Sequence, residues 1–483
     1  MELQELFRYI PGKALELISV EFGVLFLAFF FIYIWLKRYT RGAMLVWVTA
    51  FSLFFYYQFN GWLMLLLPAT ALLNYGIVEW MRRARRGKGW LLALALVADL
   101  GILAYFKYAD FFVRDVWNAL FRSNFAIRDI VVPVGISFYT FQAVSYAVDV
   151  YRGRYTARPT LLEYLFYLCF FPLLLAGPIT RAETLLPQLR RNKMSTRRDV
   201  WGGMFLILCG LVKKGVLADY LSQYNNFVFD SPATYSGVEC LLAVVGYTLQ
   251  IYYDFSGYSD LSIGIASLMG FTLRENFRLP YRSLNLTDFW RRWHISLSTW
   301  FRDYLYIPLG GNRKGRLRML LNNFITMVVA GLWHGASWMF VIWGALHGLG
   351  LVVHKLCRGW LQKIPDVFPV RALSWLMTIS FVMLAWVFFR AASLEDAWTV
   401  LSRIFSDFDP RVFVSFWDTR PTLCVLMAVA VGLGCFSPRQ WSRWKVRFIY
   451  SDWLVKLVAL LVVIQLILQL RTGEVTPFIY FQF

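Results

Sequence analysis

Apolar stretches of roughly twenty residues recur along this chain of 483 residues, and a helix of that length crosses the hydrocarbon core of a bilayer. Hydrophobic residues make up 59% of the chain and charged residues 16%, whereas a soluble domain has a larger charged share. The pattern predicts an all-α polytopic membrane protein with about eleven membrane helices.

The chain is expected to form a single integral-membrane domain over residues 1–483, because the sequence shows no soluble domain and no convincing repeat. We divide it into N-terminal spans at 1–125, a core at 126–355 and C-terminal spans at 356–483. Within the core, residues 131–151 carry too many polar side chains to face lipid. We expect this segment to be a buried or re-entrant helix.

The net charge of +20 is carried largely by short loops between the apolar stretches. This is the positive-inside pattern of membrane proteins, so we expect no nucleic-acid partner. The basic loops at 181–199 and 272–318 are predicted to face the cytosol. The acidic N-terminus lacks the basic region of a secretory signal, so we expect no cleaved signal peptide.

Aromatic side chains recur at helical spacing between Trp290 and Leu305, with arginines between them. This spacing predicts an amphipathic helix lying in the membrane interface, in contact with lipid. Arg291 and Arg302 on this helix are placed to bind either the phosphates of coenzyme A or those of lipids, and both interpretations stay open.

Several other motifs are missing or uninformative. The six cysteines show no ligand spacing and are interpreted as small packing residues, and no metal site is expected. The chain has neither a Walker A sequence nor a Gly-x-Ser-x-Gly elbow, which argues against a nucleotide-driven motor and against that class of serine hydrolase.

One histidine, His334, lies inside the long apolar run Met319–Val353. An ionisable side chain at membrane depth is a candidate functional residue, and imidazole is well suited to accept a proton near neutral pH. Gly331 and Gly335 flank it at a spacing that permits close helix approach, and Trp333 adds a large flat surface. His334 is therefore either a general base or a structural polar residue.

Two further histidines, His294 and His347, are compared with His334 as candidate functional residues. His294 falls on the predicted interfacial helix, where it is either a headgroup-level residue or a second catalytic or donor-orienting group. His347 follows His334 by thirteen residues, so on one continuous helix it would point away from His334, and we interpret it as structural.

The polar run Tyr252–Ser262 is embedded in apolar sequence and contains two acids, Asp254 and Asp260. Buried polar groups need partners, so the run is either a hydrogen-bond network between helices or a polar lining for a substrate. Asp254 is also a candidate for orienting a histidine.

Specific motifs in the core resemble the membrane-bound O-acyltransferase (MBOAT) family, and within it the bacterial alginate O-acetyltransferase branch. The principal segments are Asp288–Ser298, Trp300–Gly311 and Trp333–Gly335. Supporting segments are Pro133–Tyr139, Ala176–Ile179, Tyr253–Asp260, Asn276–Phe277 and the C-terminal tail Phe478–Phe483.

The resemblance implies membrane helices around a central tunnel, in a multi-pass protein of the bacterial cytoplasmic (inner) membrane. It implies an acyl-thioester donor, acetyl-CoA or an acyl carrier thioester, used as a substrate and not held as a bound cofactor. The acyl group, most simply acetyl, would pass to hydroxyls of an exported polysaccharide or to an extracytoplasmic partner transferase.

The family's two histidines correspond to His334 and His294 by this resemblance. The residues we expect to bind the donor or line the tunnel are Trp290, Arg291, Arg302, Trp333, Asp254, Asp260 and Asn276. D-alanyl transfer and peptidoglycan O-acyl transfer remain alternatives within the family.

Two functions of other classes remain open from the residues alone. A transporter or flippase would explain the membrane spans and the polar interior, although we find no inverted repeats of the kind such carriers use. A scaffold subunit of an exopolysaccharide modification complex would need no catalytic histidine.

Overall fold

The computed structural model describes residues 7–11, 15–126, 130–470 and 478–479. These residues contain helices and turns and no strand, so the all-α prediction is confirmed. The chain forms two compact units, one of residues 1–204 with 261–274 and the other of 205–260 with 275–483. These units do not follow the three predicted regions, and the single-domain assignment stays a prediction.

Seven described helices are long and apolar enough to cross a membrane, or eight if the bent pair Val412–Thr419 and Pro421–Cys435 forms one span. The predicted number of about eleven is therefore not confirmed. One reason is that Arg41–Arg83, whose 43 residues are long enough for two crossings, counts as one candidate. Another is that buried helices with many polar side chains are less apolar than lipid-facing ones.

The first unit contains nine whole helices in its described residues and parts of two others. The whole helices are α1 (Val20–Tyr39), α2 (Arg41–Asn60), α3 (Leu66–Arg83), α4 (Lys88–Phe111), α5 (Asn118–Phe121), α6 (Ile136–Tyr151), α7 (Leu161–Cys169), α8 (Phe171–Leu174) and α9 (Ala182–Arg191). The shared helices are α10 (Arg197–Leu211) and α12 (Gly237–Leu268).

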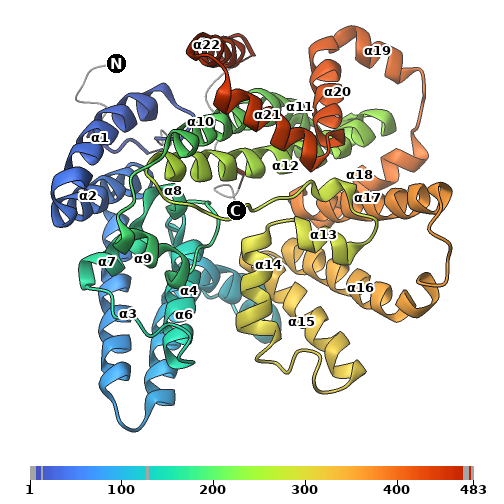
Figure 1. Cartoon of the computed structure of the whole chain (residues 1–483). Helices are drawn as coiled ribbons and strands as arrows, with labels where there is room; N and C mark the ends of the chain where they lie inside the picture. Colours follow the sequence, from blue (N-terminus) through green and yellow to red (C-terminus); the bar gives the residue numbers. More distant parts are fainter. Residues whose placement is uncertain (1–6, 12–14, 127–129, 471–477, 480–483) are drawn as a thin grey trace. The chain divides into compact units, whose positions relative to one another are not determined.

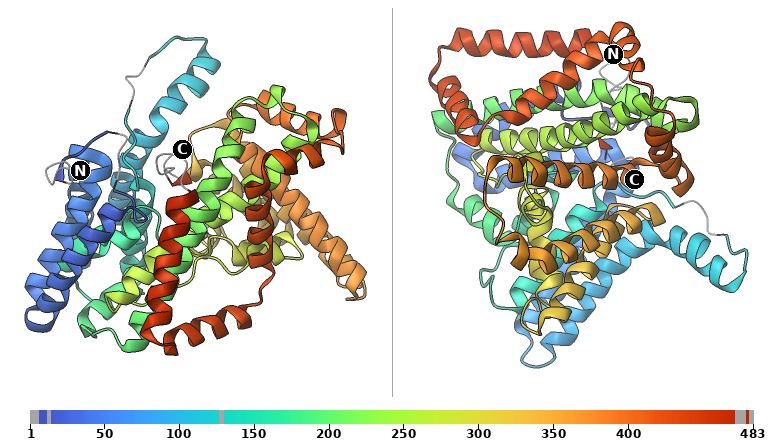
Figure 2. Two further views of the ribbon diagram at one scale, coloured as in Figure 1. Left: turned by 90° about the horizontal axis from the view of Figure 1, so that it is seen from above. Right: turned by 90° about the vertical axis from the view of Figure 1, so that its right-hand side faces the viewer.

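Phe171 of α8 forms the centre of an aromatic core in this unit. It is fully buried, and α1 and α2, which lie side by side (Figure 2, blue), surround it with aromatic rings. These rings are Phe22, Phe26, Phe29, Phe51 and Phe55. Helix α6 is buried along almost its whole length, which confirms burial for residues 136–149 of the predicted segment 131–151, whereas Val131 and Val132 are exposed.

The second unit carries most of the candidate site. Its described helices, apart from the shared α10 and α12, are α11 (Asp219–Asp230), α13 (Leu286–Arg292), α14 (Ile295–Phe301), α15 (Arg316–His334), α16 (Trp338–Leu361), α17 (Phe368–Arg390), α18 (Leu394–Ser406), α19 (Val412–Thr419), α20 (Pro421–Cys435), α21 (Pro438–Tyr450) and α22 (Trp453–Leu470). A π-helical turn, Val212–Ala218, connects α10 to α11.

The apolar run Met319–Val353 forms a helical hairpin and not one continuous helix (Figure 1). Helix α15 ends at His334, and Ser337 caps α16 by accepting a hydrogen bond from the Met339 N–H at 3.2 Å. The two helices pack along their length. A Cβ atom at Gly331 would lie 2.2 Å from the Phe340 carbonyl oxygen, so this close approach requires glycine.

The predicted interfacial helix between Trp290 and Leu305 is not a single helix. Helix α13 ends at Arg292, α14 begins at Ile295, and His294 between them has a φ of 41°. Trp293 and His294 are buried inside the protein, at 1% and 0% exposure. The pattern was amphipathic, but Trp290 and Trp293 of its aromatic face pack against Trp343 of α16 and Trp386 of α17. Contact of the rest of this segment with lipid stays a prediction.

Replacing Gly331 by alanine is expected to destabilise the protein by about 1–3 kcal/mol, because the added methyl group overlaps the backbone of α16. The measurement is thermal unfolding of purified protein in detergent. Gly359→Ala, in the same hairpin, is the matched control, because nothing lies within 4 Å of the position that its Cβ atom would take. An unchanged melting temperature in Gly331→Ala would contradict this account of the hairpin.

Candidate active site

His294 lies at the start of α14 and is held by Asn276, which precedes α13 in the chain. The His294 Nδ1 atom lies 3.2 Å from Asn276 Oδ1. The same oxygen accepts hydrogen bonds from the Ser296 N–H at 3.1 Å and the Ser296 hydroxyl at 2.9 Å. The Ile295 N–H donates to the Asn276 carbonyl at 2.9 Å, so the two segments are tied by backbone as well as side chain.

These contacts fix the protonation state of His294. A backbone N–H only donates, so the Asn276 atom facing Ser296 must be the amide oxygen, and His294 Nδ1 must carry the proton that it donates. Burial lowers the pKa of His294 to about 3, so the ring is neutral at physiological pH. Its Nε2 lone pair has no hydrogen-bond partner among the described residues and is available as a proton acceptor.

His334 terminates α15 and lies in an aromatic enclosure. It is 3% exposed, and its ring makes edge-to-face contacts with Trp333 and Trp343, each at 4.9 Å between centroids, and with Phe389 at 5.2 Å. Trp333 also contacts His294 edge-to-face at 6.0 Å. One indole therefore contacts both imidazoles, and the two predicted catalytic residues belong to one cluster.

The expectation that His347 would point away from His334 was wrong in its geometry, because α15 and α16 form a hairpin. Trp343 contacts both His347 and His334, at 4.8 and 4.9 Å. The Trp290 indole N–H donates to His347 Nδ1 at 3.3 Å. Since that N–H only donates, a neutral His347 carries its proton on Nε2, which is the opposite tautomer to His294.

Trp290 therefore packs inside the cluster, against His347 of α16. Arg291 is exposed, and Arg302 is exposed and pairs with the adjacent Asp303 at 2.8 Å. The structure does not bring either arginine into the aromatic cluster among the described residues. Their predicted roles toward donor or lipid phosphates stay predictions.

Asp254 on α12 forms a buried ion pair and does not contact a histidine among the described residues. Its carboxylate lies 2.9 Å from Lys214 Nζ, which also lies 2.8 Å from Asp219. The Ile479 N–H donates to the other Asp254 oxygen at 2.9 Å. The Asp254 network thus connects the π-helical turn, α12 and the described part of the C-terminal tail.

The tail also contacts the surroundings of His294. Phe478 is fully buried and packs on Phe255 at 5.5 Å and Tyr258 at 4.8 Å. Phe255 in turn contacts His294 edge-to-face at 4.6 Å. Of the tail predicted to match the family, only residues 478–479 lie within the described part of the chain.

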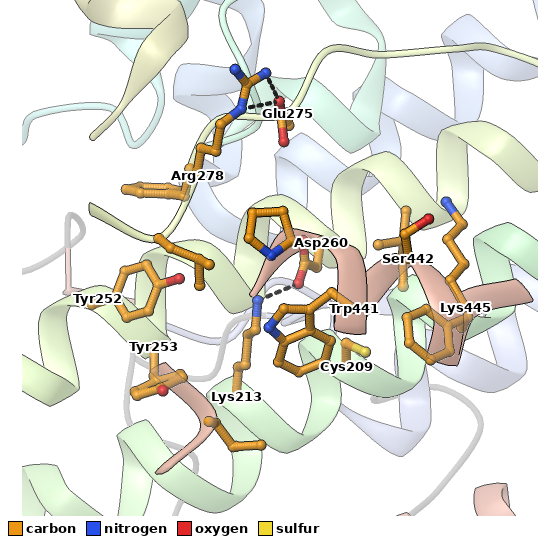
Figure 3. Close-up of a pocket in the computed structure, with 16 residues that line it drawn as sticks. Cys209, Lys213, Tyr252, Tyr253, Asp260, Glu275, Arg278, Trp441, Ser442 and Lys445 are labelled. Carbon is orange, nitrogen blue, oxygen red and sulfur yellow. Dashed lines mark hydrogen bonds and ion pairs between the residues drawn. The ribbon is translucent and has the colours of Figure 1, made fainter. Parts of the chain in front are cut away.

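A pocket of about 290 Å³ adjoins the cluster within the second unit. Its charged lining residues include Lys213 and Asp260, which point toward one another at 2.7 Å (Figure 3). The full lining is Phe205, Leu206, Cys209, Lys213, Tyr252, Tyr253, Asp260, Glu275, Phe277, Arg278, Leu279, Leu433, Pro438, Trp441, Ser442 and Lys445.

Two aromatic side chains of this pocket also contact His294 or the residue next to it. Phe277 lines the pocket and also lies 6.3 Å from the His294 ring. Tyr252 lines the pocket and lies 6.3 Å from Trp293. Of the predicted donor-binding residues, Asp260 lines this pocket, whereas Asn276 and Trp333 lie beside His294.

Some residues of the site were not identified from the sequence. Trp343 and Phe389 complete the enclosure of His334, but their apolar surroundings made them indistinguishable from ordinary core residues. Lys213 and Lys214 did carry a signal, because two adjacent lysines inside an apolar stretch need acidic partners.

The part of the chain that holds the histidine cluster is similar to known proteins. Residues 91–398 match the membrane-bound O-acyltransferase family, MBOAT. The peptidoglycan O-acetyltransferase of Helicobacter pylori is 36% identical over 400 residues, covering 76% of this chain and 75% of that protein.

Two other relatives are similar over most of the chain. The probable alginate O-acetylase AlgI of Pseudomonas aeruginosa is 40% identical over 363 residues, covering 72% of this chain and 68% of that protein. The teichoic acid D-alanyltransferase of Bacillus subtilis is 26% identical over 344 residues, covering 68% and 84% respectively.

The buried neutral state of His294 predicts a pH-dependent stability. Below about pH 6.5 the unfolded chain binds a proton at this residue that the folded protein does not bind until about pH 3. The free energy of unfolding should therefore fall with decreasing pH, by about 1.4 kcal/mol per pH unit from this residue.

The measurement is unfolding of wild type and His294→Gln between about pH 7 and pH 4.5. The variant should start less stable, because it loses the bond to Asn276, but its stability should decline less steeply with acid. His354→Gln, at a half-buried position outside the cluster, controls for loss of an imidazole. Because this ring is only half-buried, the variant should lose a smaller part of the slope than His294→Gln. Equal slopes in wild type and His294→Gln would contradict the assignment.

Proposed function

The chain belongs to the membrane-bound O-acyltransferase family, and from this premise we propose that it moves an acetyl group from a cytosolic thioester toward an exported polysaccharide. The acceptor hydroxyl belongs to the polymer or to an extracytoplasmic partner transferase. The observation that supports this most directly is the pair of buried imidazoles, His334 and His294, packed on one indole.

His334 acts as the general base. Its neutral imidazole takes the proton from the attacking hydroxyl as the oxygen bonds to the thioester carbonyl carbon. The carbon–sulfur bond then breaks, and the thiolate leaves with the proton that the imidazole had accepted. The product is an oxygen ester and a free thiol. The aromatic enclosure excludes water, which limits hydrolysis of the thioester.

His294 orients the donor beside this base. Its protonated Nδ1 is held by Asn276, so its Nε2 lone pair is fixed in direction and ready to accept a hydrogen bond from the donor or a proton during transfer. Because burial keeps this ring neutral, Nε2 retains its lone pair over the physiological pH range.

The donor enters through the pocket of about 290 Å³ beside the cluster. Lys445 lines it, and the helix that carries Lys445, α21, has three further basic residues, which suits the phosphates of coenzyme A. Tyr252 and Trp441 add aromatic surface for the apolar arm or the base. To reach His294, the thioester arm displaces the Phe277 side chain, which lies between the pocket and that ring.

The pocket lies toward the end of α12 that leads into the basic segment 272–318, the side predicted to be cytosolic. The protein is a multi-pass membrane protein, and we place it in the bacterial cytoplasmic membrane with its acceptor on the outer face. An acyl carrier thioester is the second candidate donor. D-alanyl transfer and peptidoglycan O-acylation remain candidate reactions because relatives named for them are similar to this chain.

A transporter or scaffold would not need the paired imidazoles, and family membership favours an enzyme over both. The distinction is measurable, because only a transferase consumes thioester.

Replacing His334 by alanine or asparagine is expected to lower acetyl transfer by ~10²-fold or more, because the general base is lost. The measurement is release of free coenzyme A from acetyl-CoA by purified protein together with a hydroxyl acceptor, at unchanged melting temperature. His354→Ala is the matched control and should retain near-normal rates. Wild-type rates in a folded His334 variant would refute the catalytic assignment and leave the scaffold interpretation.

Replacing Lys445 by glutamate is expected to raise the KM for acetyl-CoA about tenfold with little change in kcat, because the pocket loses one cation and gains an anion. Arg447→Glu makes the same charge change at an exposed position of α21 that does not line the pocket. High salt should shrink the Lys445 effect. If both variants have the wild-type KM, the donor does not enter here.

A further inference from the structure

A second pocket, of about 300 Å³, lies in the second unit away from the histidine cluster. It is formed by one face of α11, the segment that follows α11, and the junction of α19 and α20, where the helix axes bend by 101°. Its lining consists mainly of tyrosines, hydroxyl and amide groups and one arginine. These residues are Tyr220, Gln223, Tyr224, Phe227, Tyr235, Thr419, Arg420, Pro421, Thr422 and Leu423.

Arg420 is the only cation among these lining residues. Its guanidinium lies over the ring of Tyr224 at 5.4 Å and over Phe416 at 5.2 Å. Phe416 and Tyr224 are buried, at 3% and 6% exposure, so the two rings hold the cation in a fixed position. The guanidinium also donates a hydrogen bond to the neighbouring Thr419 hydroxyl at 3.3 Å.

Neighbouring arginines on the same side of the unit are neutralised by acids, but Arg420 is not. Arg403 pairs with Asp407 at 2.8 Å, and Arg411 pairs with Asp409 at 2.9 Å. Among the described residues, no ion pair involves Arg420. A half-buried guanidinium that faces a cavity without a carboxylate favours an anionic ligand.

The pocket lies at the opposite helix ends from the donor pocket. Lining residues of the donor pocket come from the α10 end of the long helix Arg197–Asp230, and those of the second pocket come from its α11 end. Likewise, Leu433 near the end of α20 lines the donor pocket, and Pro421 at its start lines the second.

The charge of the segments that flank the long helix Arg197–Asp230 indicates on which side of the membrane the second pocket lies. The segment that precedes Arg197 is strongly basic, whereas residues 231–236, which follow α11, carry no charge. By the positive-inside pattern, the second pocket therefore belongs to the outer face.

We propose that this pocket binds an acidic sugar residue of the exported polysaccharide. The inference rests on the proposed function only for the presence of such a polymer on this side of the membrane. Tyrosine rings offer flat surfaces for the C–H face of a pyranose ring, and Gln223 and Thr422 offer hydrogen bonds to its hydroxyls. Arg420 pairs with the ring carboxylate, for which its planar guanidinium is well matched.

The size of the pocket supports a single ring as the ligand. A volume of about 300 Å³ is at the low end of small-molecule sites and is adequate for one sugar unit of a chain. The pocket would thus hold the polymer beside the membrane while the acetyl group is delivered, and it confers a preference for acidic over neutral polymers.

The test measures binding without any thioester donor. Purified protein in phosphatidylcholine nanodiscs is titrated with trigalacturonate, and with maltotriose as a neutral trimer. Wild type should bind the acidic trimer, and Arg420→Gln should bind it about tenfold more weakly, since the variant loses a charge-assisted hydrogen bond to the carboxylate. Arg411→Gln removes an exposed arginine nearby and should retain wild-type affinity. Tyr220→Ala should weaken binding by removing one stacking surface.

Three results would overturn the proposal. These are equal affinity for wild type and Arg420→Gln, equal affinity for the acidic and neutral trimers, and displacement of the acidic trimer when phosphatidylglycerol is added to the nanodiscs. The last would assign the pocket to a lipid phosphate. Binding by His334→Ala protein separates this inference from the proposed function, because a variant unable to transfer acetyl should still bind the trimer.

Discussion

The site depends on one amide oxygen, Asn276 Oδ1, which accepts from the Ser296 N–H and hydroxyl and from His294. A buried imidazole is stable only when neutral and hydrogen-bonded. Because the Ser296 backbone fixes the amide orientation, the amide fixes the tautomer of His294 and leaves the Nε2 lone pair bare. The left-handed backbone at His294 is the local strain that accompanies this arrangement.

Close helix packing brings the second imidazole to the first. Glycines between α15 and α16 allow a hairpin so tight that a methyl group would overlap the facing backbone. Because the chain turns after His334, Trp343 of α16 packs on the His334 ring. Trp333 contacts both His334 and His294. The aromatic side chains around the two histidines form a low-dielectric environment. In such an environment a hydrogen bond to a developing charge is stronger than it is in water.

Much of the helical framework was predictable from apolar length, because hydrophobic spans leave a direct pattern. The C-terminal spans predicted within 356–483 include α17 and α22, which are long and apolar enough to cross a membrane, and the polar character of 131–151 indicated the burial of α6. The break at His294 was not predictable, since an amphipathic pattern continues across it. Likewise, the pairing of Lys214 with Asp254 depends on which helices pack, which periodicity does not encode. The sequence suggested His334 and His294, but only the hairpin explains why His347 lies near His334.

The two pockets lie at opposite helix ends of the second unit. The donor pocket adjoins His294 through Phe277, and the Arg420 pocket lies at the other end of the long helix Arg197–Asp230 and of α20. Helix α11 also connects to the His334 side, because Asn226 accepts a hydrogen bond from Arg390 at 2.9 Å and the adjacent Phe389 packs on His334. In the proposed function a charged thioester and a charged polymer have separate sites, and the uncharged acetyl group is the part that crosses the aromatic interior. This division follows the cost of charge in an apolar medium, because neither anion needs to leave the face from which it arrives.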